Sequence, residues 1–319
     1  MPLWLTEADV RAVLSLGDLI PAMESALEAF SGGAIDQPVR TAIELRPRAF
    51  FGLMPAYDRR QAVLGAKLVS VVPENADRHL PTHLAAISLF DAETGELLAV
   101  MDGRYITELR TAAVSAISVK LLARPDAGVL AILGSGVQAR SHVEALRLVR
   151  EFREMRAWSP TAQHLARFAA ECGVRAAAGA GEAVRGADVV LLATNMVTPA
   201  IDDAWVAEGA HAIAIGACRP SQREIDPALV ARARIFVDSR AAALAESGDI
   251  VQGIREGRIT ASDISAELGD VIGGRSAGRT SPREITLFKS LGLAIEDVAA
   301  AALVYRRACE TGRGLKVQL

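Results

Sequence analysis

Lysine is rare in this chain, and one lysine stands where a charge is costly. The chain has 319 residues and only four lysines, and Lys67 lies inside the apolar, β-rich run Ala62–Val72. Burying an ammonium group without a partner is unfavourable, so this position implies either an anionic partner or a water-filled cavity. The alternative is an edge strand on which the lysine stem packs and its charge reaches solvent. Lys67 is therefore a candidate for binding or catalysis.

Two arginines are candidates of the same kind. Arg40 follows Gln37-Pro-Val, and Arg110 lies in Glu108-Leu-Arg-Thr. The planar guanidinium group can donate two parallel hydrogen bonds to a carboxylate, which a lysine cannot do. Most of the many arginines of the chain must lie at the surface, so neither residue identifies a site by itself.

A glycine-rich turn gives the clearest local signal. It follows the apolar run Val129–Leu133 and precedes a helical pattern. Its first glycine allows the tight turn, its second lets backbone amides approach a pyrophosphate, and Ala139 takes the place of the third glycine. The helix N-terminus adds unpaired N–H groups. We expect this turn to bind a dinucleotide through Gly134, Ser135, Gly136, Val137 and Gln138; the alternative is a glycine turn without a ligand.

The choice between the two nicotinamide cofactors depends on the end of the next strand. An NAD site usually places an acidic residue there to bind the ribose hydroxyls. This chain has Trp158-Ser159-Pro160-Thr161 instead. Since no carboxylate would repel a 2′-phosphate and two hydroxyls could donate to it, we expect NADP(H) to be preferred, with NAD(H) possible. No arginine clearly occupies the clamp position.

The first part of the chain predicts a sheet of sequential strands. A helical stretch from Glu7 to Phe30 precedes them, and a helix from about Thr107 to Ala123 follows. Turn residues separate the expected strands Thr41–Leu45, Phe50–Leu53, Ala62–Val72, Leu84–Asp91 and Leu97–Met101. Short links between consecutive strands favour an antiparallel or mixed meander.

After Pro125 the pattern alternates between strand and helix. We expect helices over Val137–Val149 and Thr161–Cys172, and strands over Val129–Leu133, Glu154–Trp158, Ala187–Thr194, His211–Gly216 and Ala233–Asp238. This alternation predicts an α/β fold with a Rossmann-type, doubly wound parallel sheet. We expect a mobile surface loop at Gly269–Gly278 and a last helix over Ile295–Cys309.

Composition excludes several classes of protein. The net charge of −3, from 35 basic and 38 acidic residues, argues against a nucleic-acid binder, and no apolar run approaches the ~20 residues that span a bilayer. Three distant cysteines and five unclustered histidines predict neither disulfides nor a metal site. The first residues lack the pattern of a secretory signal, so we expect a cytoplasmic protein.

Several ordered motifs resemble one family. They are Arg40, Gly65-Ala-Lys67-Leu-Val, Thr82, Arg110-Thr-Ala-Ala-Val-Ser, the glycine turn, Ile215-Gly-Ala-Cys-Arg-Pro220 and Phe288-Lys-Ser-Leu-Gly-Leu-Ala-Ile-Glu-Asp297. Together they resemble the ornithine cyclodeaminase/mu-crystallin family over nearly the whole chain.

The resemblance implies a homodimer built from two-domain subunits. Residues 1–122 with 295–319 would form an α+β substrate-binding and dimerisation domain, and residues 123–294 the Rossmann domain. It also implies that Arg40, Lys67 and Arg110 hold a substrate carboxylate, with Lys67 close to the reacting C–N centre. Thr82 and His83 would line the substrate pocket, although a structural role suits His83 equally well.

Further cofactor contacts are expected after later strands. Thr194 and Asn195 follow one buried strand and would contact the ribose. Cys218 follows another, where ligands of parallel sheets commonly bind, so it either faces the nicotinamide or is a small packing residue.

Two positions separate the branches of the family. Where cyclodeaminases carry a glutamate that contacts ornithine this chain has Gly52, and where they and the archaeal alanine dehydrogenases carry an aspartate it has Cys218. The resemblance is therefore closest to the mu-crystallin-like ketimine reductases.

We accordingly expect NAD(P)H-dependent reduction of Δ1-pyrroline-2-carboxylate or Δ1-piperideine-2-carboxylate to L-proline or L-pipecolate. Lys67 would be the catalytic residue, as carboxylate clamp, proton donor or both. The alternatives are an alanine or other amino-acid dehydrogenase, then an ornithine cyclodeaminase, or a non-catalytic NADPH-dependent binding protein. One methylene separates the two imines, so their ring size stays open.

Overall fold

The computed structural model describes residues 1–318 and divides the chain into two compact units. Unit 1 combines residues 1–110 with the segment from Gly292 onward, and unit 2 is Thr111–Leu291. One boundary falls within the long helix α3 (Arg104–Leu122), which begins three residues before the expected start. The substrate-binding and dimerisation roles expected for the first domain stay predictions.

Unit 1 is built on a mixed sheet, as the sequence predicts. Its strands run in the order β16-β1-β7-β6-β5-β4-β2, with β3 paired to β4. The central strands form an antiparallel meander, while β1 pairs parallel to β7. The strands are β1 (Leu3–Leu5), β2 (Ile35–Asp36), β3 (Thr41–Arg46), β4 (Ala49–Asp58), β5 (Val63–Val71), β6 (His83–Asp91), β7 (Leu97–Asp102) and β16 (Leu315–Lys316).

The helical stretch expected over Glu7–Phe30 is divided at residues 14–15. The structure has two helices, α1 (Glu7–Val13) and α2 (Leu16–Ser31). The chain is extended at Ser15, whose hydroxyl accepts a hydrogen bond from the backbone N–H of Asp18 and so begins the second helix. A short 3₁₀ helix, η1 (Pro73–Arg78), links β5 to β6.

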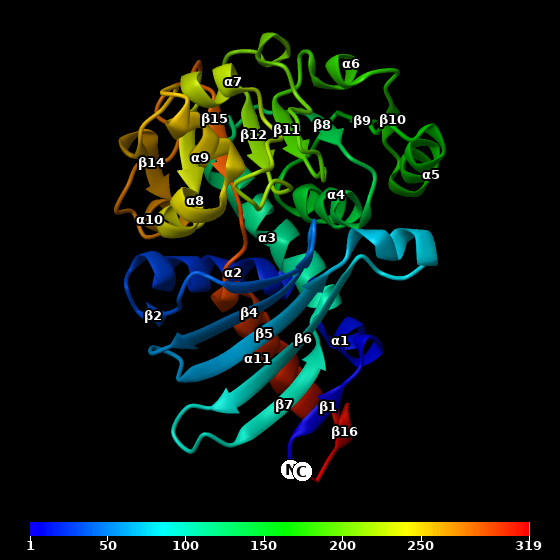
Figure 1. Ribbon diagram of the computed structural model, residues 1–319, viewed down its shortest axis with the longest axis vertical. Helices are drawn as coiled ribbons and strands as arrows, with labels where there is room; N and C mark the ends of the chain where they lie inside the picture. Colours follow the sequence, from blue (N-terminus) through cyan, green and yellow to red (C-terminus); the bar gives the residue numbers. More distant parts are fainter. Residues whose placement is uncertain (319) are drawn as a thin grey trace. The chain divides into compact units, whose positions relative to one another are not determined.

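The last helix of unit 1 lies along the sheet. Helix α11 (Ala294–Thr311) packs on β4, β5 and β6 (Figure 1). At Gly65 a Cβ atom would lie 3.2 Å from Val298 Cγ2 and 2.8 Å from the carbonyl oxygen of Ser88. Glycine therefore lets the helix approach β5 two residues from Lys67.

Unit 2 is a parallel sheet of eight strands in the order β10-β9-β8-β11-β12-β15-β13-β14. From β10 to β12 this is the 3-2-1-4-5 order of dinucleotide-binding sheets, so the expected Rossmann-type fold is confirmed. The sixth place is taken by β15, the last of these strands in the chain, with β13 and β14 outside it. The strands are β8 (Val129–Leu133), β9 (Glu154–Trp158), β10 (Arg175–Ala176), β11 (Val189–Leu192), β12 (His211–Ala214), β13 (Arg234–Val237), β14 (Ile264–Glu267) and β15 (Thr286–Lys289).

The helices of unit 2 include several that the sequence pattern does not reveal. They are α4 (Val137–Val149), α5 (Ala162–Cys172), α6 (Ala180–Val184), α7 (Pro227–Arg232), α8 (Arg240–Glu246), α9 (Gly248–Arg255) and α10 (Leu268–Ile272), with 3₁₀ helices η2 (Asp203–Trp205) and η3 (Ala261–Asp263). Helix α10 shortens the loop expected at Gly269–Gly278, because Leu268 and Gly269 are buried and begin a helical turn, while residues 273–278 lie outside helices and strands.

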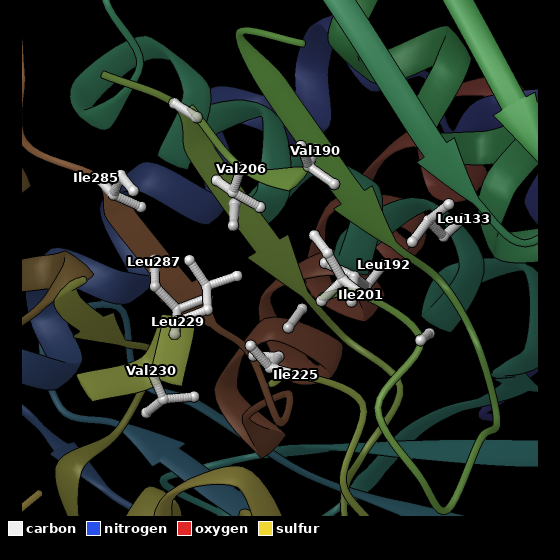
Figure 2. Packing of buried hydrophobic residues seen from close by; sticks show 14 of the residues in the cluster. Leu133, Val190, Leu192, Ile201, Val206, Ile225, Leu229, Val230, Ile285 and Leu287 are labelled. Atoms are coloured by element: carbon white, nitrogen blue, oxygen red, sulfur yellow. The ribbon is translucent and has the colours of Figure 1, made fainter. Parts of the chain in front are cut away.

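The core of unit 2 lies against its central strands. Figure 2 shows Leu133, Val190, Leu192, Ile225 and Leu287 within one cluster of buried apolar side chains. These residues come from β8, β11 and β15 and from the segment before α7, so burial of their side chains fixes the strands whose ends carry the expected cofactor residues. Among residues 1–318, no helix is long and apolar enough to cross a membrane.

Candidate functional site

Lys67 is buried in the middle of the unit 1 sheet. It lies on β5 between Met54 of β4 and Ile87 of β6, and only 1% of the residue is exposed. Its Nζ lies 2.5 Å from Oδ2 of Asp297, in the first turn of α11. Of the two possibilities left by the sequence, the edge-strand alternative is excluded and an anionic partner is present.

Arg110 joins the same pair of groups. Its Nη1 donates to Oε2 of Glu296 at 2.7 Å, and its Nε donates to Oδ1 of Asp297 at 3.2 Å. Both carboxylates are fully buried. Asp297 therefore forms ion pairs with both Arg110 and Lys67. Helix α11 thus supplies the counter-ions of two expected substrate-binding residues, Arg110 on α3 and Lys67 on β5.

Arg40 approaches this group from the segment before β3. Its Nη2 donates to the carbonyl oxygen of Gly292 at 3.2 Å, while the side-chain oxygen of Gln37 accepts from the backbone N–H of Ile295 at 2.8 Å. Gly292 has φ of +80°, and a Cβ there would lie 2.3 Å from Nη1 of Arg110. Only glycine allows the chain to enter α11 this close to the guanidinium group.

The net charge of this group favours one bound anion. We call Arg40, Lys67, Arg110, Glu296 and Asp297 the cation cluster. By formal charge, its three cations and two carboxylates sum to one positive charge. Since groups of opposite sign attract strongly where water is scarce, the cluster suits a substrate with a single carboxylate.

The pKa of Lys67 is lowered to about 8. Burial is the main cause, and the nearby Arg110 and Arg40 lower it further, whereas Asp297 raises it. A lysine with this pKa is largely protonated at neutral pH yet can give up its proton more easily than an exposed lysine.

His83 belongs to the same surroundings, while the expected role of Thr82 in lining the pocket stays a prediction. Burial, together with the charges of Lys67 and Arg110, lowers the pKa of His83 to about 4, so its imidazole is neutral at pH 7. Thr82 is exposed, and its carbonyl oxygen accepts from the N–H of Val72. The structure thus brings together Arg40, Lys67, His83 and Arg110.

Glu296 and Asp297 were missed as functional residues from the sequence. The sequence does contain a sign of them, because two adjacent acidic residues stand within the otherwise apolar stretch Leu291–Val304. Lys67, a basic residue in an apolar strand, is the corresponding sign for the opposite charge. Buried carboxylates are rare without partners, so the pair could have been matched with the buried cations.

In unit 2 the glycine turn has the form that a dinucleotide requires. Gly134 has φ of +119°, and a Cβ there would lie 2.3 Å from the carbonyl oxygen of Ala193. Gly136 begins α4, and a Cβ on it would meet no atom within 4 Å. At Gly134 the turn therefore packs tightly against the residue that follows β11. At Gly136 it leaves open space.

Polar groups around this turn fit a dinucleotide. Ser135 donates to the Ser159 hydroxyl at 2.9 Å, which links the turn to the end of β9. Thr161 begins α5 without using its side chain as a cap. Oε1 of Gln138 is buried and has no hydrogen-bond partner among residues 1–318. Val137 is exposed beside it. These residues would hold the pyrophosphate and the adenosine ribose.

The other expected cofactor residues lie at the ends of neighbouring strands. Thr194 and Asn195 follow β11, and Cys218 follows β12. Thr194 and the turn before Cys218 are bonded to Glu224, a fully buried carboxylate that the sequence analysis did not single out. The carboxyl ends of β8, β11 and β12 are adjacent, as a dinucleotide site requires.

Comparisons with known proteins show the family to which the chain is similar. Residues 2–312 match the model of the ornithine cyclodeaminase/mu-crystallin family. The chain is 44% identical over 311 residues to the ketimine reductase mu-crystallin of Mus musculus, covering 95% of this chain and 96% of the relative.

Two solved structures are also similar. The Δ1-pyrroline-2-carboxylate reductase of Thermococcus litoralis, in complex with NADH and L-proline, has 36% identity and a TM-score of 0.96 and covers 99% of this chain and 100% of its own. An archaeal alanine dehydrogenase dimer with bound NAD has 36% identity and a TM-score of 0.95, with 99% of each chain covered. The chain belongs to the ornithine cyclodeaminase/mu-crystallin family.

Proposed function

We propose that this protein is an NAD(P)H-dependent reductase of a cyclic ketimine carboxylate, Δ1-pyrroline-2-carboxylate or Δ1-piperideine-2-carboxylate, and that it forms L-proline or L-pipecolate. The observation that carries the proposal is the cation cluster, with its single excess positive charge and a lysine whose pKa is about 8. The similarity to reductases of such imines supports it.

The residues of unit 1 bind and polarise the substrate in this account. Arg40 and Arg110 hold the carboxylate, because a guanidinium group can form two parallel hydrogen bonds with it. Lys67 adds a third charge and gives its proton to the imine nitrogen. A protonated imine is already an electrophile, so fixing its position contributes much of the rate.

The cofactor supplies the hydride that ends on the imine carbon. What unit 2 contributes is binding and orientation, through the α4 N-terminus and the strand ends that carry Thr194 and Cys218. The nitrogen keeps the proton received from Lys67, and the product is a cyclic secondary amine with its carboxylate intact.

NADP(H) is the cofactor we propose, with NAD(H) possible. The end of β9 presents Ser159, and Thr161 at the start of α5 keeps its hydroxyl uncommitted to capping. A 2′-phosphate needs hydrogen-bond donors and no neighbouring carboxylate, which is what these two positions offer. The two similar structures contain NADH and NAD, so the preference of this chain for NADP(H) needs its own experiment.

A homodimer is the assembly that we propose. On the sheet face opposite Lys67, unit 1 exposes apolar side chains that pair across strands: Ile43 with Phe51, and Leu53 with Leu68. Contiguous exposed apolar patches of this kind usually mark an interaction surface. The archaeal alanine dehydrogenase to which the chain is similar is a dimer.

Two positions favour a ketimine reductase over related activities. Gly52 lies on β4 on the same face of the sheet as Lys67, where a glutamate of a cyclodeaminase would contact an amine. Cys218 stands where a catalytic aspartate is expected in cyclodeaminases and in the archaeal alanine dehydrogenases. The two carboxylates expected to bind and deprotonate an amino substrate in those relatives are therefore replaced in this chain. A binding protein without activity would not need three cations around one carboxylate.

The test follows NADPH and NADH oxidation with Δ1-pyrroline-2-carboxylate and Δ1-piperideine-2-carboxylate. Parallel reactions contain L-ornithine with NAD⁺, and pyruvate with ammonia and NADH. We expect rapid oxidation with the imines alone, and a higher kcat/KM with NADPH. Ammonia release from ornithine or turnover of pyruvate would overturn the assignment, and cofactor binding without any turnover would favour the binding protein.

A further inference from the structure

Unit 2 contains a second buried group of charges, separate from the cation cluster. Lys289 ends β15, and its Nζ lies 3.1 Å from Oε1 of Glu224 and 3.2 Å from Oδ2 of Asp249. All three side chains are fully buried. Burying three ionisable groups is costly, and a core of apolar residues of similar volume would often be as stable. The cost of burying these charges suggests a role other than stability, and the hydrogen bonds that the three residues make show which parts of the chain they fix.

Glu224 joins two loops at the carboxyl edge of the sheet. Its Oε1 accepts from the backbone N–H groups of Gly216, at 2.7 Å, and Ala217, at 3.1 Å, in the loop after β12. Its Oε2 accepts from the hydroxyl of Thr194, at 3.2 Å, in the loop after β11. One carboxylate thus fixes the backbone just before Cys218 and the side chain of Thr194.

The other two charges fix Glu224 itself. Oδ1 of Asp249 accepts from the backbone N–H groups of Glu224 and Ile225 at 2.9 and 3.0 Å. Lys289 lies between the two carboxylates and offsets their repulsion. The loops are also in close contact, since a Cβ on Gly216 would lie 1.8 Å from the carbonyl oxygen of Thr194. A small displacement of Glu224 must therefore move both loops.

These loops occupy the half of the sheet that receives one end of a dinucleotide. In sheets of this strand order the two halves of the cofactor lie on opposite sides of the switch point, between β8 and β11. The glycine turn and Ser159 belong to β8 and β9, on the adenosine side. Thr194 and Cys218 follow β11 and β12, on the nicotinamide side.

We propose that Glu224, held by Lys289 and Asp249, is a positioning residue for the nicotinamide end of the cofactor. It sets where Thr194 and the Gly216–Cys218 loop meet the nicotinamide ribose and ring, and it leaves the adenosine end unaffected. This inference rests on the dinucleotide-binding part of the proposed function and not on the identity of the imine.

The test compares two ligands on the same variants. NADPH carries the nicotinamide ribose and ring, and 2′-phospho-ADP is the adenosine end of the same molecule without either; NADH and ADP form the second pair. The variants are Glu224→Asp, which keeps the charge near Lys289 but withdraws it from the two loops, and Glu224→Gln, which keeps the length but cannot accept from Thr194 through its amide nitrogen. Glu208→Asp, at an exposed ion pair of the same unit, is the matched control.

We expect both Glu224 variants to bind NADPH about tenfold more weakly, as the loss of hydrogen bonds to a charged acceptor implies, while their affinity for 2′-phospho-ADP stays near that of the wild type. Glu208→Asp should change neither. In the imine reaction we expect kcat to fall more than KM for the imine rises, because hydride transfer depends on the orientation of the ring.

An equal loss for both ligands would mean that Glu224 only maintains the fold, and unchanged NADPH affinity would also overturn the proposal. Should Glu224→Gln fail to fold, Glu224→Asp decides alone.

The inference can fail or hold separately from the proposed function, because a wild type that binds NADPH yet reduces no imine contradicts the imine assignment only. A wild type that binds neither NADPH nor NADH contradicts both.

Discussion

At Lys67 the protein keeps an ammonium group inside a sheet by surrounding it with other charges. Asp297 compensates it directly, while Arg110 and Arg40 oppose it. The balance leaves the pKa of Lys67 at about 8, between that of an exposed lysine and neutrality. Such values are typical of groups that donate protons near physiological pH.

The first prediction concerns the proton of Lys67. Because its folded-state pKa lies near 8 and the reaction uses the protonated form, kcat/KM for imine reduction should fall as pH rises through about 8. Lys67→Met should lower kcat/KM by about a hundredfold or more, the usual contribution of a positioned proton donor. NADPH affinity should stay unchanged.

The control is Lys316→Met, which replaces an exposed lysine and should leave activity unchanged. Full activity of Lys67→Met would show that Lys67 takes no part in the chemistry.

A second prediction tests the role of Asp297. Its carboxylate raises the pKa of Lys67, so Asp297→Asn should move the alkaline fall in kcat/KM to lower pH. Activity should drop several-fold at pH 8 and much less at pH 6. Arg110 keeps Glu296 as a partner in this variant, and a thermal melt checks that unit 1 stays folded. An alkaline limb that is unmoved or shifted upward would contradict the assigned coupling.

At the scale of elements, the two glycines before α4 make different predictions. Gly136 has φ of −82°, which any residue adopts, and open space where its Cβ would point. Gly136→Ala should therefore melt like the wild type but bind NADPH at least about tenfold more weakly, because the Cβ enters the space of the pyrophosphate. Gly134→Ala should destabilise unit 2, because its Cβ would overlap the carbonyl of Ala193.

Equal melting and equal NADPH affinity for Gly136→Ala would show that the open space is not the ligand site. Isothermal titration and a thermal melt on the same samples separate the two effects.

Elements with strong local signals were predicted closely from the sequence. The bounds of β8, α4 and β9 agree with expectation because apolar runs there alternate with a glycine turn and a clear helical period. The strand β15 was missed, since it has only four residues and ends in a lysine. Its charge is neutralised by Glu224 and Asp249, which are distant in the chain. Charge neutralisation by residues that are distant in the chain leaves no pattern in the sequence around the strand.

The candidate site shows the same division. The sequence predicts that Lys67 needs either a partner or water, and the resemblance adds Arg40 and Arg110. The partner itself, Asp297, is brought to β5 only by the packing of α11 on the sheet. The chemistry of the site residues could be predicted from the sequence. Which helix packs on which strand, and so which residues become partners, could not.

For the whole molecule, the exposed apolar face of unit 1 predicts the assembly. Phe51 and Leu53 of β4, with Leu68 of β5, point away from the face that carries Lys67. Placing a charge there, as in Leu53→Glu, should convert the dimer into a monomer in sedimentation velocity runs at micromolar concentration. Leu148→Glu, at an exposed leucine of α4, is the control. A wild type that sediments as a monomer would contradict this assembly.

The most direct test of the account compares two ring imines, Δ1-pyrroline-2-carboxylate and Δ1-pyrroline, which lacks the carboxylate. If the cation cluster binds that carboxylate, kcat/KM with NADPH should be at least about a hundredfold lower for Δ1-pyrroline, since several hydrogen bonds between charged groups are lost. Comparable values for the two imines would contradict the assignment of Arg40, Lys67 and Arg110 to the substrate.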